Sequence, residues 1–199
     1  MSVPEAQQWA LAYAALGWRV FPVVAGGKRP MYKGWQADAT VDPSLIGRHW
    51  RGEPAPNIGL VCGEVFVAFD IEAPHLSTLR DWMQARGLRL PATPIARTGR
   101  GGIHILARVP SIEERGHPLV LDGLHIGELK AAGGFIVAAP SVTSGRYGWH
   151  RSPLEAEVAA APDWLMGLVH VPSPAIAAGC GRTIGIAEGE RRLAALAQS

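Results

Sequence analysis

The first 57 residues alternate between amphipathic and apolar segments. Trp9, Tyr13 and Leu16 recur at helical spacing and are followed by a glycine, which predicts a helix that ends near residue 16. Residues 18–24 form an apolar run that stops at a Gly-Gly pair and predicts a strand. A proline-containing loop comes next, and a short helix is expected near residues 45–50.

From residue 58 onward the pattern becomes that of β-strands. Residues 58–62 and 65–72 are rich in β-branched and aromatic side chains, and the Gly-Glu pair between them predicts a hairpin. The other expected elements are a helix after Pro74, a strand over 102–109, a second hairpin formed by 124–130 and 135–138, and a short helix over 162–169. Strands and helices therefore mix along the chain.

The pattern changes again near the C-terminus. Residues 171–182, VPSPAIAAGCGR, are rich in Pro, Ala and Gly without periodicity and are interpreted as a linker after a first domain of residues 1–170. Residues 183–199 are interpreted as the start of a following helical region. A lone helix after a linker buries its apolar face poorly, so we expect this chain to be part of a longer protein.

Composition limits the classes of protein that the chain can belong to. Hydrophobic residues make up 48% and charged residues 18%, which predicts a packed core. A net charge of +2 is compatible with nucleic-acid binding but does not argue for it. Two isolated cysteines provide neither a disulfide framework nor a structural zinc site. No leader and no membrane-spanning apolar stretch is present, so we expect a cytoplasmic protein without membrane contact.

Two acidic residues end the strand-like run VFVAFDIE. Asp70 and Glu72 alternate with apolar side chains, so they project from the same face with Cα atoms roughly 7 Å apart. Two carboxylates at that spacing can share divalent metal ions. Acidic residues are also common where strands emerge into solvent, and the pair taken alone favours that simpler interpretation.

Two further segments combine strand alternation with glycines and cations. His104 and Arg108 share one face of their strand, which follows the glycine-rich, arginine-containing turn RTGRGG, a composition suited to phosphate. Glu128 and Lys130 also share a face, beside another Gly-Gly turn. The first could equally be a flexible polar turn, and the second an ordinary surface ion pair.

The order of these segments along the chain favours their functional interpretations over the simpler ones. The segments GGKRP, PNIGLVCG, FDIE, RTGRGGIH, ELKAAGGFIVAAPS and RYGWH follow one another along the chain. Together they resemble the primase-polymerase domain of the archaeo-eukaryotic primase superfamily, over roughly residues 5–165. In that family one strand carries an acidic pair, a second carries a histidine after a glycine-rich turn, and a third carries another acidic residue.

The resemblance implies an α+β fold, in which an RRM-like catalytic sheet packs with an N-terminal α/β unit around the active site. It also implies template-dependent nucleotidyl transfer by a DNA primase or polymerase that uses two Mg²⁺ or Mn²⁺ ions. The implied catalytic metal ligands are Asp70, Glu72 and Glu128. The implied nucleotide-binding residues are His104, Arg100, Lys130, Lys28, Thr98 and Ser141. The implied DNA-binding residues are Arg97, Arg108 and Arg146.

The partners implied by the resemblance are single-stranded DNA template and nucleoside triphosphates, and a helicase fused C-terminally or acting in trans stays open. The chain departs from the family pattern where Glu128 replaces the usual Asp, and it carries no ligand set for the zinc-binding insertion of some relatives. Two alternatives remain at this stage. One is a metal-dependent nuclease, and the other is a non-catalytic DNA-binding replication module with the same fold.

Overall fold

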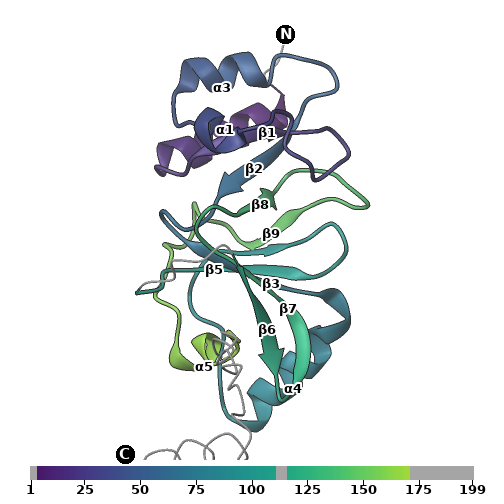
Figure 1. The fold of residues 1–199 in the computed structure, drawn as a ribbon, viewed down its shortest axis with the longest axis vertical. Helices are drawn as coiled ribbons and strands as arrows, with labels where there is room; N and C mark the ends of the chain where they lie inside the picture. The colour runs from purple at the N-terminus through teal and green to yellow at the C-terminus, as the bar shows by residue number, and fades with distance from the viewer. Residues whose placement is uncertain (1–3, 111–115, 171–199) are drawn as a thin grey trace, which may run out of the picture.

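Two antiparallel β-sheets organise the protein, which a computed structural model describes over residues 4–110 and 116–170 (Figure 1). The N-terminal elements are α1 (Glu5–Ala15), β1 (Val20–Val23), α2 (Trp35–Asp38), α3 (Pro43–His49) and β2 (Asn57–Val61). The central elements are β3 (Val67–Ile71), the 3-10 helix η1 (Ala73–His75), α4 (Leu76–Ala85), β4 (Ile95–Arg97) and β5 (Ile103–Ala107). The last are β6 (Gly116–Leu121), β7 (Leu124–Lys130), β8 (Phe135–Ala138), β9 (Gly148–Arg151) and α5 (Asp163–Met166).

The smaller sheet has the strand order β1-β2-β8, and the larger has the order β6-β7-β3-β5-β4-β9. The mixture of helices and antiparallel strands confirms the expected α+β class. Within the larger sheet, β3, α4, β4 and β5 follow one another as in a β-α-β-β-α-β unit, and β7 pairs with the free side of β3. Between β5 and β7, where such a unit has its second helix, this chain has strand β6. Helix α5 comes instead from the C-terminal end of the described chain.

The N-terminal unit packs its helices against one face of the small sheet. Helix α1 buries a stripe formed by Ala10, Tyr13 and Ala14, while Leu16, expected to belong to this face, is 40% exposed at the helix end. Helix α3 begins where the Asp42 carboxylate accepts a hydrogen bond from the backbone N–H of Ser44. The buried cluster of α1, α3 and the small sheet also reaches two strands of the large sheet.

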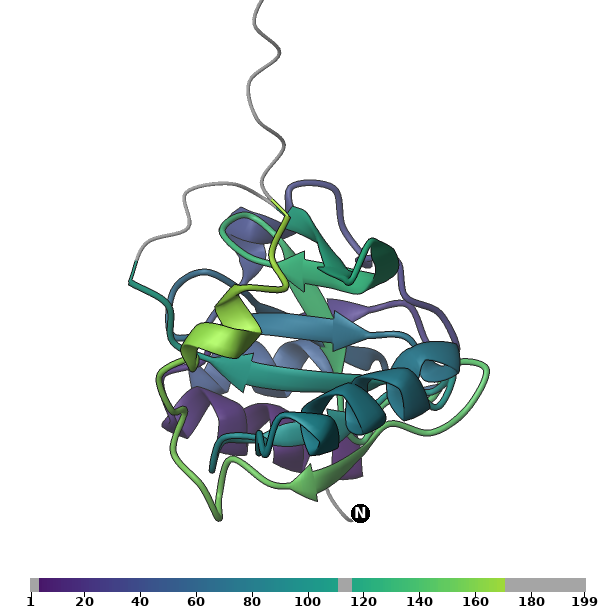
Figure 2. The same cartoon turned by 90° about the horizontal axis from the view of Figure 1, so that it is seen from below.

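The opposite end of the molecule is a second core, between the large sheet and helices α4 and α5. Leu79 and Met83 of α4 and Leu165 of α5 pack with Phe69 and Ile71 of β3. Viewed along this direction, α4 and α5 lie on the near side of β3 and β5, and α1 lies behind them (Figure 2). This arrangement confirms the amphipathic helix predicted after Pro74.

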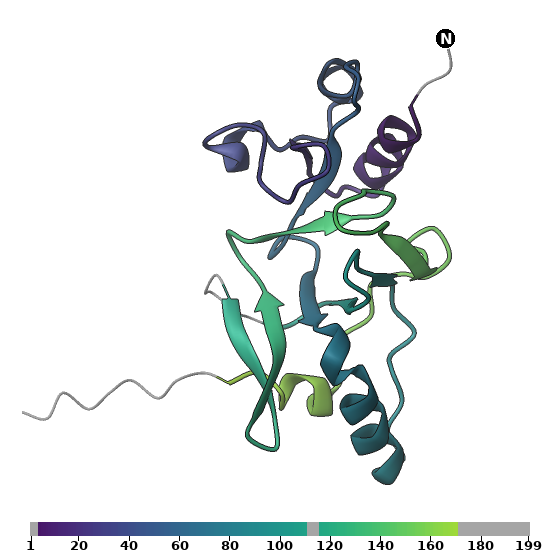
Figure 3. The ribbon, with the colours of Figure 1, turned by 90° about the vertical axis from the view of Figure 1, so that its right-hand side faces the viewer.

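The two expected hairpins do not form. Strand β2 belongs to the small sheet and β3 to the large one, and β7 and β8 are divided in the same way. Each glycine-containing connection carries the chain from one sheet into the other, and the two crossings lie against each other (Figure 3). A Cβ on Gly63 would lie 2.3 Å from the Cα of Ala132, so a side chain there would drive the crossings apart.

The residues interpreted as linker and following helix, 171–182 and 183–199, lie outside the described residues. Within residues 4–110 and 116–170, none of the helices is both long and apolar enough to cross a lipid bilayer.

Candidate active site

Three polar side chains form a row across the middle of the large sheet. Asp70 on β3 is paired in register with His104 on β5 and with Glu128 on β7. Residues directly opposite each other in antiparallel strands point to the same face, with Cβ atoms about 4.5–5.5 Å apart. The backbone therefore brings the carboxylate of the first motif, the histidine of the second and the acidic residue of the third together on one face.

The row lies at the edge of the part of the large sheet that the N-terminal unit covers. Ala68 lies two residues before Asp70 on β3, and its partner Leu106 lies two residues after His104 on β5. Both point to the same face as the row and are fully buried in the N-terminal core. Asp70 and Glu72 follow Ala68 at two-residue intervals and emerge from beneath that cover. The apolar-to-polar change along β3 therefore marks the rim of the contact between the two units.

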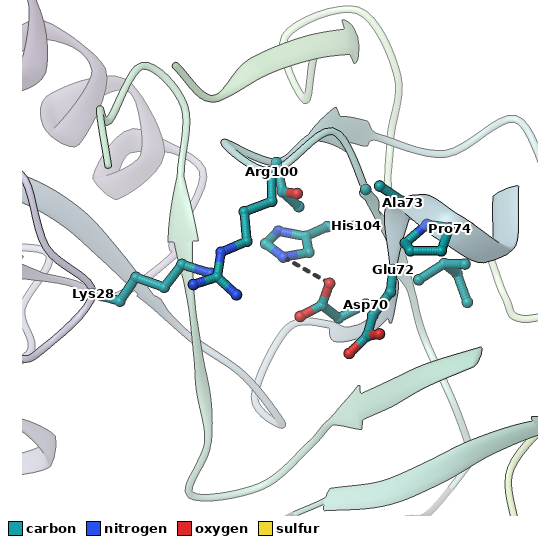
Figure 4. Close-up of a pocket in the computed structure, with 10 residues that line it drawn as sticks. Lys28, Asp70, Glu72, Ala73, Pro74, Arg100 and His104 are labelled. Atoms are coloured by element: carbon teal, nitrogen blue, oxygen red, sulfur yellow. Dashed lines mark ion pairs between the residues drawn. The ribbon is translucent and has the colours of Figure 1, made fainter. Parts of the chain in front are cut away.

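A pocket of about 410 Å³ opens at this rim (Figure 4). Its lining combines two carboxylates, a histidine and two cations with backbone of the glycine-rich turn. The lining residues are Lys28, Asp70, Ile71, Glu72, Ala73, Pro74, Thr98, Arg100, Gly102 and His104. The acidic pair, the histidine and the loop cations implied by sequence resemblance thus share one cavity.

The Asp70 carboxylate faces the His104 imidazole, with Oδ1 and Nε2 3.5 Å apart. The Asp70 side chain is one-third exposed, whereas that of His104 is 5% exposed. Burial raises the pKa of Asp70, but the hydrogen bond and charge of His104, aided by Lys130 and Lys28, outweigh it and hold that pKa below its usual value. The carboxylate is therefore ionised at neutral pH.

The glycine-rich turn between β4 and β5 presents Arg100 at its tip. The backbone N–H of Thr98 donates to the Gly102 carbonyl at 2.8 Å, closing the turn. A Cβ on Gly102 would lie 2.4 Å from the Ile71 carbonyl oxygen, so glycine is required for β5 to enter beside β3. In Figure 4 the side chains of Arg100 and Lys28 reach toward His104 and Asp70.

Glu128 is in the row but outside the pocket lining. Its carboxylate contacts the ammonium group of Lys130, two residues along β7, and is 56% exposed. Among residues 4–110 and 116–170 no three His, Cys, Asp or Glu side chains are grouped closely enough to hold one metal ion. The two carboxylates nevertheless fit a hard divalent cation, because Asp70 is ionised and both Asp70 and Glu72 offer oxygen ligands in the same pocket.

The other predicted site residues lie elsewhere. The buried Ser141 hydroxyl accepts a hydrogen bond from the backbone N–H of Ile58, so this group serves the fold. Arg97 pairs in register with Ile103 and therefore projects from the opposite face of the sheet to His104. Arg108 is exposed beyond the covered Leu106.

The remaining predicted DNA contact, Arg146, donates to both carboxylate oxygens of Glu5 at 2.7 and 2.6 Å. Tyr147, an aromatic residue next to it, is 2% exposed and packs near the His104 ring, with centroids 6.1 Å apart. Neither side chain lines the pocket around Asp70.

Sequence reasoning missed Asn57, a buried amide at the start of β2 that joins two loops beside the pocket. The available signal was a polar residue opening an otherwise apolar strand, NIGLV. It also missed the contribution of Ala73 and Pro74, which line the pocket from η1, directly after the acidic pair.

The family model for the N-terminal domain of bifunctional DNA primase/polymerases (Prim-Pol) matches residues 10–164. That match covers well over half of the chain, and the protein belongs to this family. At family level the activity is DNA primase/polymerase-type nucleotidyl transfer, with DNA and nucleotides as substrates. A search of curated proteins found no match to the chain.

Proposed function

We propose that this domain is a template-dependent DNA primase or polymerase whose reaction centre is the pocket at Asp70. The observation that carries the proposal is the row His104–Asp70–Glu128, which lies at the rim of a cavity lined by Lys28 and Arg100. Carboxylates can hold the metal ions of a phosphoryl transfer, and an imidazole and two cations from separate loops can stabilise the charge on the phosphates.

In this proposal the carboxylates of Asp70 and Glu72 hold divalent Mg²⁺ or Mn²⁺, two ions in all, with Glu128 as a third ligand. When bound, such ions lower the pKa of a primer 3′-hydroxyl and stabilise the charge of the leaving pyrophosphate. Asp70 is suited to this role because its lowered pKa keeps it ionised. Glu128 would join the set if it released Lys130, its partner in the ion pair.

The remaining groups act on the nucleotide. The 3′-oxygen attacks the α-phosphorus of an incoming triphosphate, and the bond to the pyrophosphate oxygen breaks. Arg100 and Lys28 would neutralise the triphosphate, and His104, fixed against Asp70, would donate a hydrogen bond to a phosphate oxygen. Lys130, once released from Glu128, is a further cation beside this row. Because the cations come from loops on both units, the nucleotide would bridge the two units.

The test uses labelled nucleotide, single-stranded DNA template, and Mg²⁺ or Mn²⁺. We expect the wild-type protein to incorporate label, and Asp70→Ala and Glu72→Ala to lose incorporation while remaining folded. Asp81→Ala, an exposed carboxylate on α4, is the matched control and should keep full activity. Template degradation in the absence of nucleotides would identify a nuclease instead.

Template binding without any synthesis would identify a non-catalytic replication module. Retained synthesis by both Asp70→Ala and Glu72→Ala would place the reaction centre elsewhere. Comparing ribo- and deoxynucleotides, and primed and unprimed templates, in the same assay also determines substrate preference and the capacity to start chains.

A further inference from the structure

Asn57 is a buried amide whose hydrogen bonds all go to the backbone of two other loops. It opens β2 and is 6% exposed. Its Nδ2 donates to the carbonyl oxygens of Gly27 at 3.0 Å and Val142 at 2.7 Å. Its Oδ1 accepts from the backbone N–H of Val142 at 3.0 Å. Three hydrogen bonds from one side chain thus join segments that are 115 residues apart in sequence.

The first of these loops carries Lys28. Gly27, which accepts from Asn57, directly precedes Lys28, and the Lys28 side chain lines the pocket that contains Asp70. The loop turns at Gly26, whose φ is +73°, and is closed by a hydrogen bond from the Val24 N–H to the Arg29 carbonyl at 2.9 Å. Asn57 therefore holds the residue that directly precedes an exposed cation of the pocket lining.

The second loop abuts the turn that carries Arg100. Val142 is followed by a short turn in which the Thr143 N–H donates to the Gly145 carbonyl at 3.0 Å. Gly145 lies directly against Gly99: a Cβ on Gly99 would be 2.5 Å from the Gly145 oxygen, and one on Gly145 would be 2.4 Å from the Gly99 oxygen. Gly99 in turn lies between two residues of the pocket lining, one of which is Arg100.

We propose that Asn57 is a positioning residue for nucleotide binding, because it fixes the two loops that aim Lys28 and Arg100 at the triphosphate. The inference rests on the proposed function, since it assigns the two cations to the triphosphate. Asn57 itself touches neither the pocket nor the reacting groups. An amide side chain suits this position because it can donate to two carbonyls and accept from one N–H at the same time.

The test measures the dissociation constant of a fluorescent dATP analogue with Mn²⁺, together with KM and kcat in the labelled-nucleotide assay. We expect Asn57→Ala to raise the dissociation constant and KM about tenfold and to change kcat by less than about threefold, because the loops shift while the carboxylates stay in place. Asn57→Asp should be at least as impaired, since a carboxylate would face two carbonyl oxygens.

A matched control separates positioning from general stability. Thr93 is fully buried, and its hydroxyl donates to the Leu106 carbonyl and accepts from the Ala159 N–H, away from both loops. Thr93→Val should lower the melting temperature as Asn57→Ala does, but leave the dissociation constant for dATP within about twofold. If Asn57→Ala does not fold, Asn57→Ser, which keeps a small hydrogen-bonding group, provides the same comparison.

A combined variant tests the route of the effect. In a Lys28→Ala/Arg100→Ala background, adding Asn57→Ala should weaken dATP binding by less than about twofold, because the groups it positions are already gone. An undiminished tenfold effect in that background, or no effect of Asn57→Ala in the otherwise native protein, overturns the inference while leaving the proposed function standing. Failure of the wild-type protein to bind any nucleoside triphosphate overturns both.

Discussion

Asp70 and His104 face each other directly across strands β3 and β5, with Oδ1 and Nε2 3.5 Å apart. Their Cα atoms are in register, so the pairing is fixed by the backbone ladder. The imidazole is buried and the carboxylate is one-third exposed to the pocket. This geometry presents one edge of an ionised carboxylate to the cavity while its other edge is held by the protein.

The first prediction concerns the pH dependence of folding stability. His104 on β5, Lys130 on β7 and Lys28 from the loop after β1 face Asp70 and hold its folded-state pKa below the usual 3.8. A depressed carboxyl pKa contributes stability above the unfolded pKa, and that contribution is lost as pH falls through the folded pKa. In urea titrations, the stability difference between wild type and Asp70→Asn should have its full value near pH 5 and shrink below 3.8. A difference that grows on acidification would contradict this.

The second prediction separates the two contributions of His104. His104→Ala removes both the hydrogen bond and the charge beside Asp70, whereas His104→Gln retains an amide donor and removes only the charge. The Asp70 pKa, followed by carboxyl ¹³C NMR, should rise in both variants and rise further in the alanine variant. The KM for nucleotide should increase about tenfold in His104→Ala. An unchanged Asp70 pKa in both variants would show that the contact with His104 is not what lowers it.

The third prediction concerns competition for Glu128. Lys130 contacts the Glu128 carboxylate, so a metal ion that recruits Glu128 must displace it. Lys130→Met should therefore increase Mn²⁺ affinity in the absence of nucleotide by about two- to fivefold, the range for loss of an exposed ion pair. Electron paramagnetic resonance of free Mn²⁺ measures this directly. Because Lys130 also acts on Asp70, the gain should be smaller, though not absent, when Glu128→Gln/Lys130→Met is compared with Glu128→Gln. An equal gain in that comparison would show that Lys130 does not compete with the metal ion for Glu128.

The fourth prediction concerns the approach of β7 to β3. A Cβ on Gly127 would lie 1.9 Å from the Asp70 carbonyl oxygen, so Gly127→Ala must separate the two strands and displace the neighbouring Glu128 from its row. We expect a loss of about 2–4 kcal/mol in unfolding free energy. Gly148→Ala on β9, where a Cβ meets nothing within 4 Å, should change stability by less than about 0.5 kcal/mol. Urea denaturation of both variants checks this, and equal losses would contradict it.

Strand alternation was sufficient to predict which faces carry the polar groups. Asp70 and Glu72 do line one pocket together, and His104 and Glu128 project from the same face of the sheet as Asp70. Alternation says nothing about register, because register depends on pairing between distant segments. The direct opposition of Asp70 to both His104 and Glu128 therefore required the structure.

The wrong hairpins have a local cause. Gly63-Glu64 and residues 131–134 have the composition of tight turns, and short connections between strands usually join neighbours in one sheet. In the structure Gly63 packs tightly against Ala132 at the two crossings, a contact between segments 69 residues apart that local composition does not reveal. Asn57 was missed for a related reason. Its three partners are backbone atoms of remote loops, and every residue type carries the same carbonyl, so a sequence does not indicate which backbone groups a side chain will bond.

The paired crossings have a mechanical consequence. The chain passes directly from β2 into β3 and from β7 into β8. Because β2 pairs with β8 and β3 pairs with β7, two paired connections join the two units side by side. The Cys62 N–H donates to the Gly134 carbonyl at 3.0 Å, which joins the two connections between the sheets. Such a connection resists both twisting and opening. Adjustment to a nucleotide should therefore come from the side chains and turns at the rim, with the two units moving as one body.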